Sequence, residues 1–234
     1  MTAADPTDSL RAWWDNDADV DPEAYEPTEE PRPAEPEPLP PAPSRDFVHL
    51  HVHSEFSLLD GLSPVEHIVE TVKRRGMRAV ALTDHGNLYG AIDFYSHARS
   101  AGIKPILGVE TYVSPRGMSD KLGNQDRNYF HLVLLAKNLE GYHNLIKLVS
   151  RASLEGYYYK PRIDRALLAE HARGLIALSA CYSGEPSRAI LESDFERARD
   201  AAAWYRGVFG EDYFLELQDH GSPDDQTVNA VCSS

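Results

Sequence analysis

Short apolar runs alternate with amphipathic helical segments along this chain, and that alternation limits the folds open to it. The runs lie at residues 79–83, 105–109, 132–135 and 175–180, and such short runs are typical of buried strands. Helical periodicity follows a capping box at 63–66, recurs from 139 to 149 and recurs again from 194 to 208. Alternating strands and helices predict an α/β domain with a parallel sheet, in which functional groups gather at strand ends.

Histidines alternate with apolar residues in the segment from Phe47 to His53. Strict alternation on a strand puts Phe47, His49, His51 and His53 on one face. Two imidazoles at i and i+2 can hold one divalent ion from the same side, and histidine is the commonest nitrogen ligand for zinc. Taken alone, this segment leaves open a strand whose histidines are partly buried and satisfied by hydrogen bonds.

Further potential metal ligands stand where the other apolar runs begin or end. Asp84 and His85 follow the first run, Glu110 follows the second, and Cys181 follows the last. With the others they form a set that is too large for one tetrahedral ion: His51, His53, Asp60, His85, Glu110, His131 and Cys181. The set predicts two or three divalent metal ions bridged by carboxylate or water, with metal-assisted hydrolysis as the chemistry.

These residues fall in motifs that resemble a known family. Segments 51–61 (HVHSEFSLLDG) and 83–87 (TDHGN) resemble the PHP (polymerase and histidinol phosphatase) domain. Segments 102–110 (GIKPILGVE), 158–164 (YYKPRID) and 213–221 (YFLELQDHG) narrow the resemblance to the N-terminal region of bacterial DNA polymerase III alpha subunits, the C-family replicative polymerases. The resemblance covers residues 46 to about 230.

The resemblance implies a PHP-type distorted (β/α)7 barrel with a trinuclear centre of zinc, manganese or iron. The seven residues of the set fall on the family's ligand positions, with Glu110 as the best candidate for a bridge. The implied reaction is phosphodiester hydrolysis at a DNA 3′ end, a 3′–5′ exonuclease that proofreads during replication. Other replicase subunits would be partners through the full-length polymerase, and nucleotidyl transfer would belong to a palm domain beyond residue 234.

The family's last motif, an Asp-x-His pair after a further strand, is not found in this sequence. Asp219 and His220 are adjacent and would point to opposite faces of a strand, so we expect a loop there. We therefore expect the barrel to be incomplete at its C-terminal end. Two alternatives stay open: a stand-alone PHP phosphoesterase acting on small phosphate monoesters, and a non-catalytic scaffold fragment with exposed sheet edges.

Four residues outside the ligand set have expected supporting roles. His49 lies deeper in its segment, so we expect it to pack against its neighbours or to hydrogen-bond to a ligand. Asp84 precedes His85, so we expect it to orient an imidazole or to cap the following turn. Lys160 and Arg162 lie in a tyrosine-rich segment, a composition suited to holding a substrate phosphate beside a stacked base. A packed loop with solvated charges is the alternative for that segment.

The first 45 residues differ in composition from the rest of the chain. They contain ten of the sixteen prolines and carry a net charge of −9, which predicts a disordered acidic tail before a PHP domain at 46–234. Within the tail, Leu10, Trp13 and Trp14 have the spacing of a short helix that docks in a partner's groove.

Composition also sets expectations about compartment and partners. No apolar run approaches the ~20 residues of a membrane span, and the two cysteines, Cys181 and Cys232, provide no disulfide framework. We expect a cytoplasmic protein without membrane contact. Residues 46–234 carry a net charge of −5, so a broad basic surface does not supply DNA affinity in this part of the chain.

Overall fold

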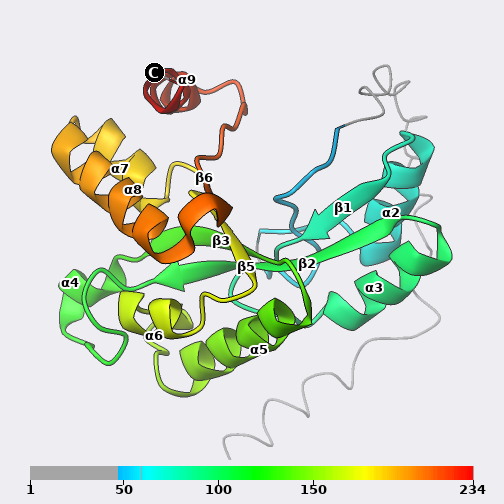
Figure 1. Cartoon of the computed structure of the whole chain (residues 1–234), viewed down its shortest axis with the longest axis horizontal. Coiled ribbons are helices and arrows are strands. Elements are labelled where there is room, and N and C mark those ends of the chain that lie inside the picture. Colours follow the sequence, from blue (N-terminus) through cyan, green and yellow to red (C-terminus); the bar gives the residue numbers. More distant parts are fainter. Residues whose placement is uncertain (1–46, 59, 234) are drawn as a thin grey trace, which may run out of the picture. The chain divides into compact units, whose positions relative to one another are not determined.

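The computed structural model describes residues 47–58 and 60–233. The expected tail, with Leu10, Trp13 and Trp14, lies outside the described residues. Helices and strands alternate through the described part (Figure 1). Their order is α2 (Val65–Arg74), β1 (Ala79–Leu82), α3 (Ala91–Ser100), β2 (Lys104–Val113), α4 (Gly123–Arg127), β3 (Phe130–Ala136), α5 (Leu139–Leu154), β4 (Arg162–Ile163), α6 (Arg165–Glu170), β5 (Leu175–Leu178), α7 (Glu185–Leu191), α8 (Phe195–Phe209), the 3-10 turn η2 (Gly210–Asp212), β6 (Tyr213–Phe214) and α9 (Pro223–Cys232).

The strands form a mixed sheet in the order β1-β2-β3-β5-β6, with β4 paired to β2. Neighbours β1 and β2 are parallel, as are β5 and β6, whereas β3 runs antiparallel to both β2 and β5. The predicted α/β class is therefore confirmed, but the prediction of a wholly parallel sheet is wrong. Between β2 and β3 the chain forms the five-residue helix α4, and β3 then returns beside β2 as its antiparallel neighbour.

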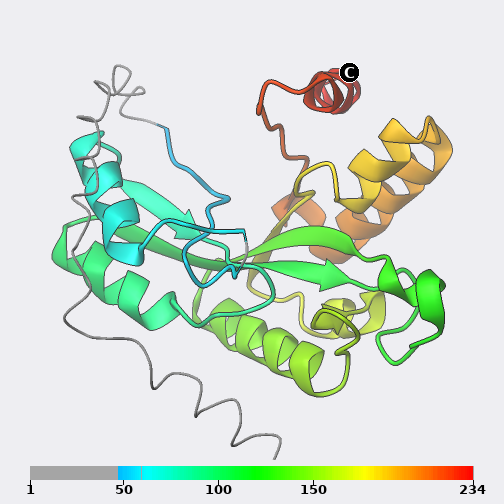
Figure 2. The same ribbon diagram turned by 180° about the vertical axis from the view of Figure 1, so that it is seen from behind.

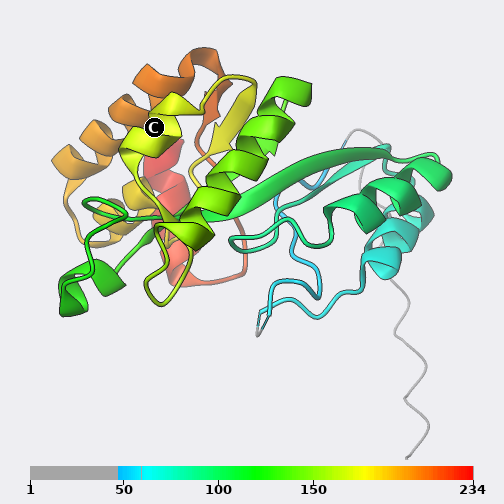
Figure 3. The same ribbon diagram turned by 90° about the horizontal axis from the view of Figure 1, so that it is seen from below.

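One face of the sheet is covered by helices. Leu132 and Leu134 of β3 pack with Leu145 and Leu148 of α5 and with Tyr205 of α8 in one buried cluster. Figure 3 shows α5 lying along the sheet beneath β2 and β3. Removing this apolar surface from water is the main force that fixes α5 and α8 against the strands.

The opposite face carries the polar residues that build the site. Side chains alternate along β3, so Val133 and Leu135 point away from the helices and pack with Leu178 in a second buried cluster. Glu110 lies directly opposite Val133 across the β2–β3 pair. His131 shares the parity of Val133, and the register therefore places Glu110 and His131 on this same face.

Helix α2 confirms the predicted amphipathic pattern but not its predicted cap. Its buried residues Val65, Ile68, Val69 and Val72 pack in a cluster that includes α3 and β1, which lie side by side in Figure 2. Pro64 stands at the cap position without a side-chain hydrogen bond, so the capping box predicted at 63–66 is wrong. The backbone N–H of Val65 instead donates to the Glu55 carboxylate, at 3.3 Å.

The helix predicted over 194–208 is α8, and it begins and ends at the residues that its sequence signals indicate. The side chain of Asp194 accepts a hydrogen bond from the Arg197 N–H at the start of α8. Gly210, with a φ of +59°, follows the last residue of that helix, a conformation that glycine adopts without steric cost. The Asp219–His220 segment lies outside helix and strand, as expected.

The predicted strand over residues 47–53 is wrong. This segment contacts β1 through two backbone hydrogen bonds, from Ala81 N–H to His49 O and from Thr83 N–H to Val52 O. Three residues along this segment therefore match two residues along β1, as in a β-bulge. A bulge shifts the alternation of the side chains. His49 is exposed, whereas the rings of His51 and His53 reach Glu110.

No helix in the ranges 47–58 and 60–233 combines the length and the apolar character needed to cross a membrane.

Candidate metal centre

The carboxylate of Glu110 lies at the middle of the candidate site and is only 1% exposed. Its Oε2 is 2.6 Å from His53 Nε2 and 3.0 Å from His51 Nε2. Its Oε1 is 2.7 Å from His131 Nδ1. His85 Nδ1 lies 3.2 Å from Oε2. These imidazoles come from segments far apart in sequence and meet at one buried carboxylate.

The local backbone explains how His85 reaches this point. His85 follows β1 and forms an isolated parallel bridge with Glu110, and the Gly86 N–H donates to the Glu110 carbonyl at 2.9 Å. Gly86 has a φ of +64°, and a Cβ at this position would lie 2.8 Å from Pro161. The glycine after His85 is therefore required by both conformation and space.

Asp60 and Cys181 complete the cluster from opposite sides. Asp60 Oδ2 lies 2.5 Å from His85 Nε2 and 3.9 Å from His53 Nδ1, and the Asp60 side chain is 58% exposed. Cys181 Sγ lies 4.0 Å from Glu110 Oε1 and 3.9 Å from His131 Nδ1. The structure thus brings the predicted ligand set together, with Asp60 at the solvent side and Cys181 beyond β5.

Hydrogen bonds with Glu110 help to raise the pKa of two imidazoles, those of His51 and His131. Burial alone would lower the pKa of His51, but hydrogen bonds with Glu110 and Glu216 outweigh it and raise the pKa to about 10. For His131, burial is likewise outweighed by hydrogen bonds with Cys181 and Glu110, and the pKa rises to about 9. Burial would raise the pKa of Glu110, yet its hydrogen bonds with the histidines hold it well below the usual range.

His85 behaves differently from the other two histidines. Burial lowers its pKa despite the opposing charge of Glu110, so the ring favours the neutral form that binds metal. Its Nδ1 is buried and lacks a hydrogen-bond partner. A buried nitrogen with an unshared lone pair is costly unless something binds it.

The donor set fits divalent metal ions. Groups of three potential ligands have donor atoms within 4.8 Å of one another, and imidazole nitrogens with carboxylate oxygens are the usual ligands of zinc and related ions. The groups are His51, His53 and Glu110, then His53, Asp60 and His85, then His85, Glu110 and His131. They share members, so the geometry resembles a cluster more than a single isolated site.

The two expected supporting residues, His49 and Asp84, do not contact the ligand side chains directly. His49 is exposed and its ring contacts Phe47, with centroids 4.8 Å apart, rather than a ligand. Asp84 is buried and accepts hydrogen bonds from the N–H and hydroxyl of Ser54 and from the hydroxyl of Ser57, each at 2.7 Å. Asp84 therefore fixes the loop between His53 and Asp60 instead of orienting an imidazole directly.

The expectation that Arg162 binds a substrate phosphate is wrong. Its side chain is fully buried, and its guanidinium donates to the backbone carbonyls of Met118, Asp120, Asp126 and Gly156. Three of these bonds hold the loop between β2 and β3, the fourth holds the turn after α5, and burial closes the guanidinium to a ligand. The sequence could not reveal this, because the partners are backbone oxygens that no residue type encodes.

Lys160 lies closer to the cluster than Arg162 does. Its Nζ is 5.4 Å from the centre of the Tyr112 ring, and that ring stacks on His85 with an interplanar angle of 10°. Lys160 is half-buried. The lysine charge is therefore one aromatic ring away from a candidate ligand.

Glu216 and Gln218 are part of the site although the sequence reasoning did not assign them. Glu216 Oε1 lies 2.7 Å from His51 Nδ1, and Gln218 Nε2 lies 2.6 Å from the same oxygen. The signal was present: both follow a strand end, two residues apart, like the other candidate residues.

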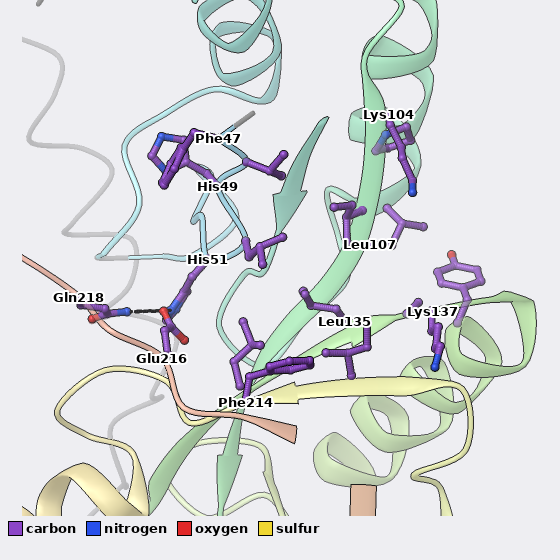
Figure 4. Close-up of a pocket in the computed structure, with 18 of the residues that line it drawn as sticks. Phe47, His49, His51, Lys104, Leu107, Leu135, Lys137, Phe214, Glu216 and Gln218 are labelled. Carbon is purple, nitrogen blue, oxygen red and sulfur yellow. Dashed lines mark hydrogen bonds and ion pairs between the residues drawn. The ribbon is translucent and has the colours of Figure 1, made fainter. Parts of the chain in front are cut away.

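A cavity of about 1410 Å³ adjoins this part of the site. Its walls combine apolar residues such as Leu107, Leu135 and Phe214 with the polar group of His51, Glu216 and Gln218 (Figure 4). The cavity lies on the sheet face that the helices leave uncovered.

The chain is similar in sequence to several bacterial proteins and matches a number of solved structures. The chain is 49% identical over 187 residues to DNA polymerase III subunit alpha of Borreliella burgdorferi. This match covers 78% of this chain and 16% of that protein. The same subunit of Thermus aquaticus is 47% identical over 189 residues, or 79% of this chain and 16% of the relative. The chain therefore spans about one sixth of the length of these relatives. Among solved structures, an amidohydrolase from Chromobacterium violaceum is 20% identical, with a TM-score of 0.31, over 78% of this chain and 54% of that one.

The family comparison covers nearly the whole described range. The model of the PHP domain matches residues 49–220, which include His51 at one end and Glu216 near the other. All seven candidate ligands lie within the match. The chain belongs to the PHP domain family.

Proposed function

We propose that this chain is the PHP portion of a DNA polymerase III alpha subunit, and that its site hydrolyses phosphodiester bonds at a DNA 3′ end. The reaction would be a 3′–5′ exonuclease step that proofreads during replication. The observation that supports it is the meeting of His51, His53, His85 and His131 at Glu110, in a chain 47–49% identical to alpha subunits.

The centre would hold two or three ions of zinc, manganese or iron through the seven candidate ligands. Both oxygens of Glu110 face imidazoles, so this carboxylate is the proposed bridge. Bound ions would lower the pKa of a water molecule and offset the charge on the phosphoryl and leaving oxygens. Burial of Glu110 keeps bulk water from weakening these interactions.

Lys160 is the proposed contact for the substrate phosphate. It lies at the Tyr112–His85 stack, and a lysine ammonium is a strong point charge for phosphate oxygens. Tyr129, which is half-buried and meets Tyr112 edge to face with centroids 4.8 Å apart, offers an aromatic surface nearby. A terminal base stacked there would sit next to the ligand cluster.

DNA and the other replicase subunits are the proposed partners, in the cytoplasm. DNA-directed DNA polymerase activity would belong to the full-length protein. With a net charge of −5 over residues 46–234, this domain would rely on other domains for most of its DNA affinity.

Metal analysis followed by a nuclease assay tests the proposal. The 234-residue chain is exchanged into metal-free buffer, its bound metals are measured, and a 5′-labelled single-stranded oligonucleotide is then offered with Mn²⁺ or Zn²⁺. We expect two or three ions per chain and stepwise shortening from the 3′ end. Both should be lost in His53→Gln and kept in His143→Gln, whose ring is exposed on α5.

Two results would contradict the proposal. Hydrolysis of p-nitrophenyl phosphate by a metal-loaded chain that leaves oligonucleotides intact would favour a small-molecule phosphoesterase. Negligible metal in the purified chain would favour a non-catalytic scaffold.

A further inference from the structure

His51 connects two carboxylates, of which only one belongs to the proposed ligand set. Its Nε2 lies 3.0 Å from Glu110 and its Nδ1 lies 2.7 Å from Glu216. The two carboxylates thus face opposite nitrogens of one imidazole. Glu216 is not among the groups of potential ligands around Glu110. It therefore contacts the histidine and would not contact the metal.

The backbone places Glu216 independently of His51. Strand β6 pairs in parallel with β5, and the Ser179 N–H donates to the Phe214 carbonyl at 3.0 Å. The Glu216 N–H then donates to the Ser179 hydroxyl at 2.8 Å, and Ser179 is buried. The carboxylate is therefore held by the sheet, as a fixed acceptor should be.

The Glu216 carboxylate sets the direction of its hydrogen bond with His51, because an ionised carboxylate only accepts. Gln218 Nε2 lies 2.6 Å from Glu216 Oε1 and 3.0 Å from His51 Nδ1. An amide nitrogen only donates, and its short contact with the Glu216 oxygen makes that oxygen its acceptor. His51 Nδ1–H donates to the same oxygen, and in the metal-free chain Nε2–H donates to Glu110. Loss of the Nε2 proton would free its lone pair for a metal ion.

We propose that Glu216 is a positioning residue for the metal centre, which fixes the ring orientation and tautomer of His51 so that Nε2 is presented as a ligand. Gln218 supports it by donating to the same carboxylate oxygen. A carboxylate behind a metal-binding histidine also makes the imidazole a stronger base. The inference rests on the proposed metal centre.

Zinc affinity measured with matched variants tests this role. The metal-free 234-residue chain, Glu216→Ala, Glu216→Gln and the control Glu211→Ala are titrated with Zn²⁺ against a competing chelator. Loss of such a partner typically weakens metal binding about 10–100-fold, and we expect this for Glu216→Ala. Glu216→Gln keeps the shape and a neutral acceptor, so we expect a smaller loss of about fivefold. Glu211 lies in η2 and its side chain is 92% exposed, so Glu211→Ala should leave the zinc affinity unchanged.

A second measurement separates positioning from a merely structural role. In the zinc-loaded chain labelled with ¹⁵N-histidine, His51 Nδ1–H should give a downfield, slowly exchanging proton signal. That signal should disappear in Glu216→Ala and persist in Glu211→Ala. If Glu216→Ala does not fold, the zinc affinity of the isosteric Glu216→Gln decides.

The outcomes distinguish this inference from the metal centre itself. A chain that binds zinc with unchanged affinity in both Glu216 variants would overturn the positioning role and leave the centre standing. Failure of the unchanged chain to bind zinc would overturn the centre and this inference with it.

Discussion

The guanidinium of Arg162 donates to the backbone carbonyl of Asp126, with Nη1 and oxygen 2.7 Å apart. The same side chain also donates to the carbonyls of Met118, Asp120 and Gly156. The charge is thus used to hold the β2–β3 loop against β4. Any effect of an Arg162 substitution on activity must be separated from its effect on folding.

We expect Arg162→Met to lower the free energy of unfolding by about 3 kcal/mol or more, because buried carbonyls would lose their donors. Urea denaturation monitored by circular dichroism measures this change. Arg173→Met is the matched control, since the Arg173 side chain is 84% exposed and surface changes usually stay within about 0.5 kcal/mol. Equal stability of the two variants would contradict the structural role of Arg162.

Lys160 gives the opposite expectation. Lys160→Ala should leave the unfolding free energy nearly unchanged but weaken binding of a single-stranded oligonucleotide. One lost phosphate contact should reduce the slope of log affinity against log salt by about 0.7, which fluorescence anisotropy at several salt concentrations detects. Lys147→Ala, exposed on α5, should keep the original slope. An unchanged slope in Lys160→Ala would remove Lys160 from the proposed substrate contacts.

Local signals in the sequence sufficed to predict the cluster around Glu110. A strand end followed by a histidine or carboxylate is visible within a few residues, and the sheet brings such ends together. Glu216 carries the same signal, but its role depends on His51, 165 positions away. Sequence spacing alone does not show which carboxylate contacts the metal and which contacts the far nitrogen of a ligand.

The errors in the fold have equally specific causes. The hydrogen bonds between the segment 47–53 and β1 match three residues to two, and a bulge of this kind has no signature in an apolar–histidine repeat. The antiparallel pairing of β3 with β2 and β5 likewise has no local signature in the apolar runs that form these strands. Both features are set by tertiary contacts, whereas the amphipathic faces of α2, α5 and α8 are set by local periodicity.

Two glycines with different surroundings should respond to alanine in opposite ways. A Cβ at Gly184 would lie 2.0 Å from the Ser179 carbonyl oxygen and 3.1 Å from that of Cys181. Gly184→Ala should therefore lower the free energy of unfolding by about 1–3 kcal/mol and displace Cys181. Gly207 lies in α8 with open space around it, and Gly207→Ala should raise the free energy of unfolding by about 0.5–1 kcal/mol. Thermal unfolding of both variants checks the sign of each change.

Removing the metal should reverse how stability depends on pH. In the metal-free chain the pKa of His51 is raised to about 10 and that of His131 to about 9. The stability that these two protonated histidines contribute to the folded chain is fully present below their unfolded pKa of about 6.5. It is lost as the pH rises through their pKa values in the folded chain. We therefore expect the unfolding free energy of metal-free protein, measured by urea denaturation, to fall between pH 7 and pH 10, and the fall to be smaller in His51→Gln.

Zinc binds only deprotonated imidazole, so the zinc-loaded chain should instead gain stability from pH 6 to pH 8. Parallel profiles for the two forms would contradict a metal centre built on these histidines.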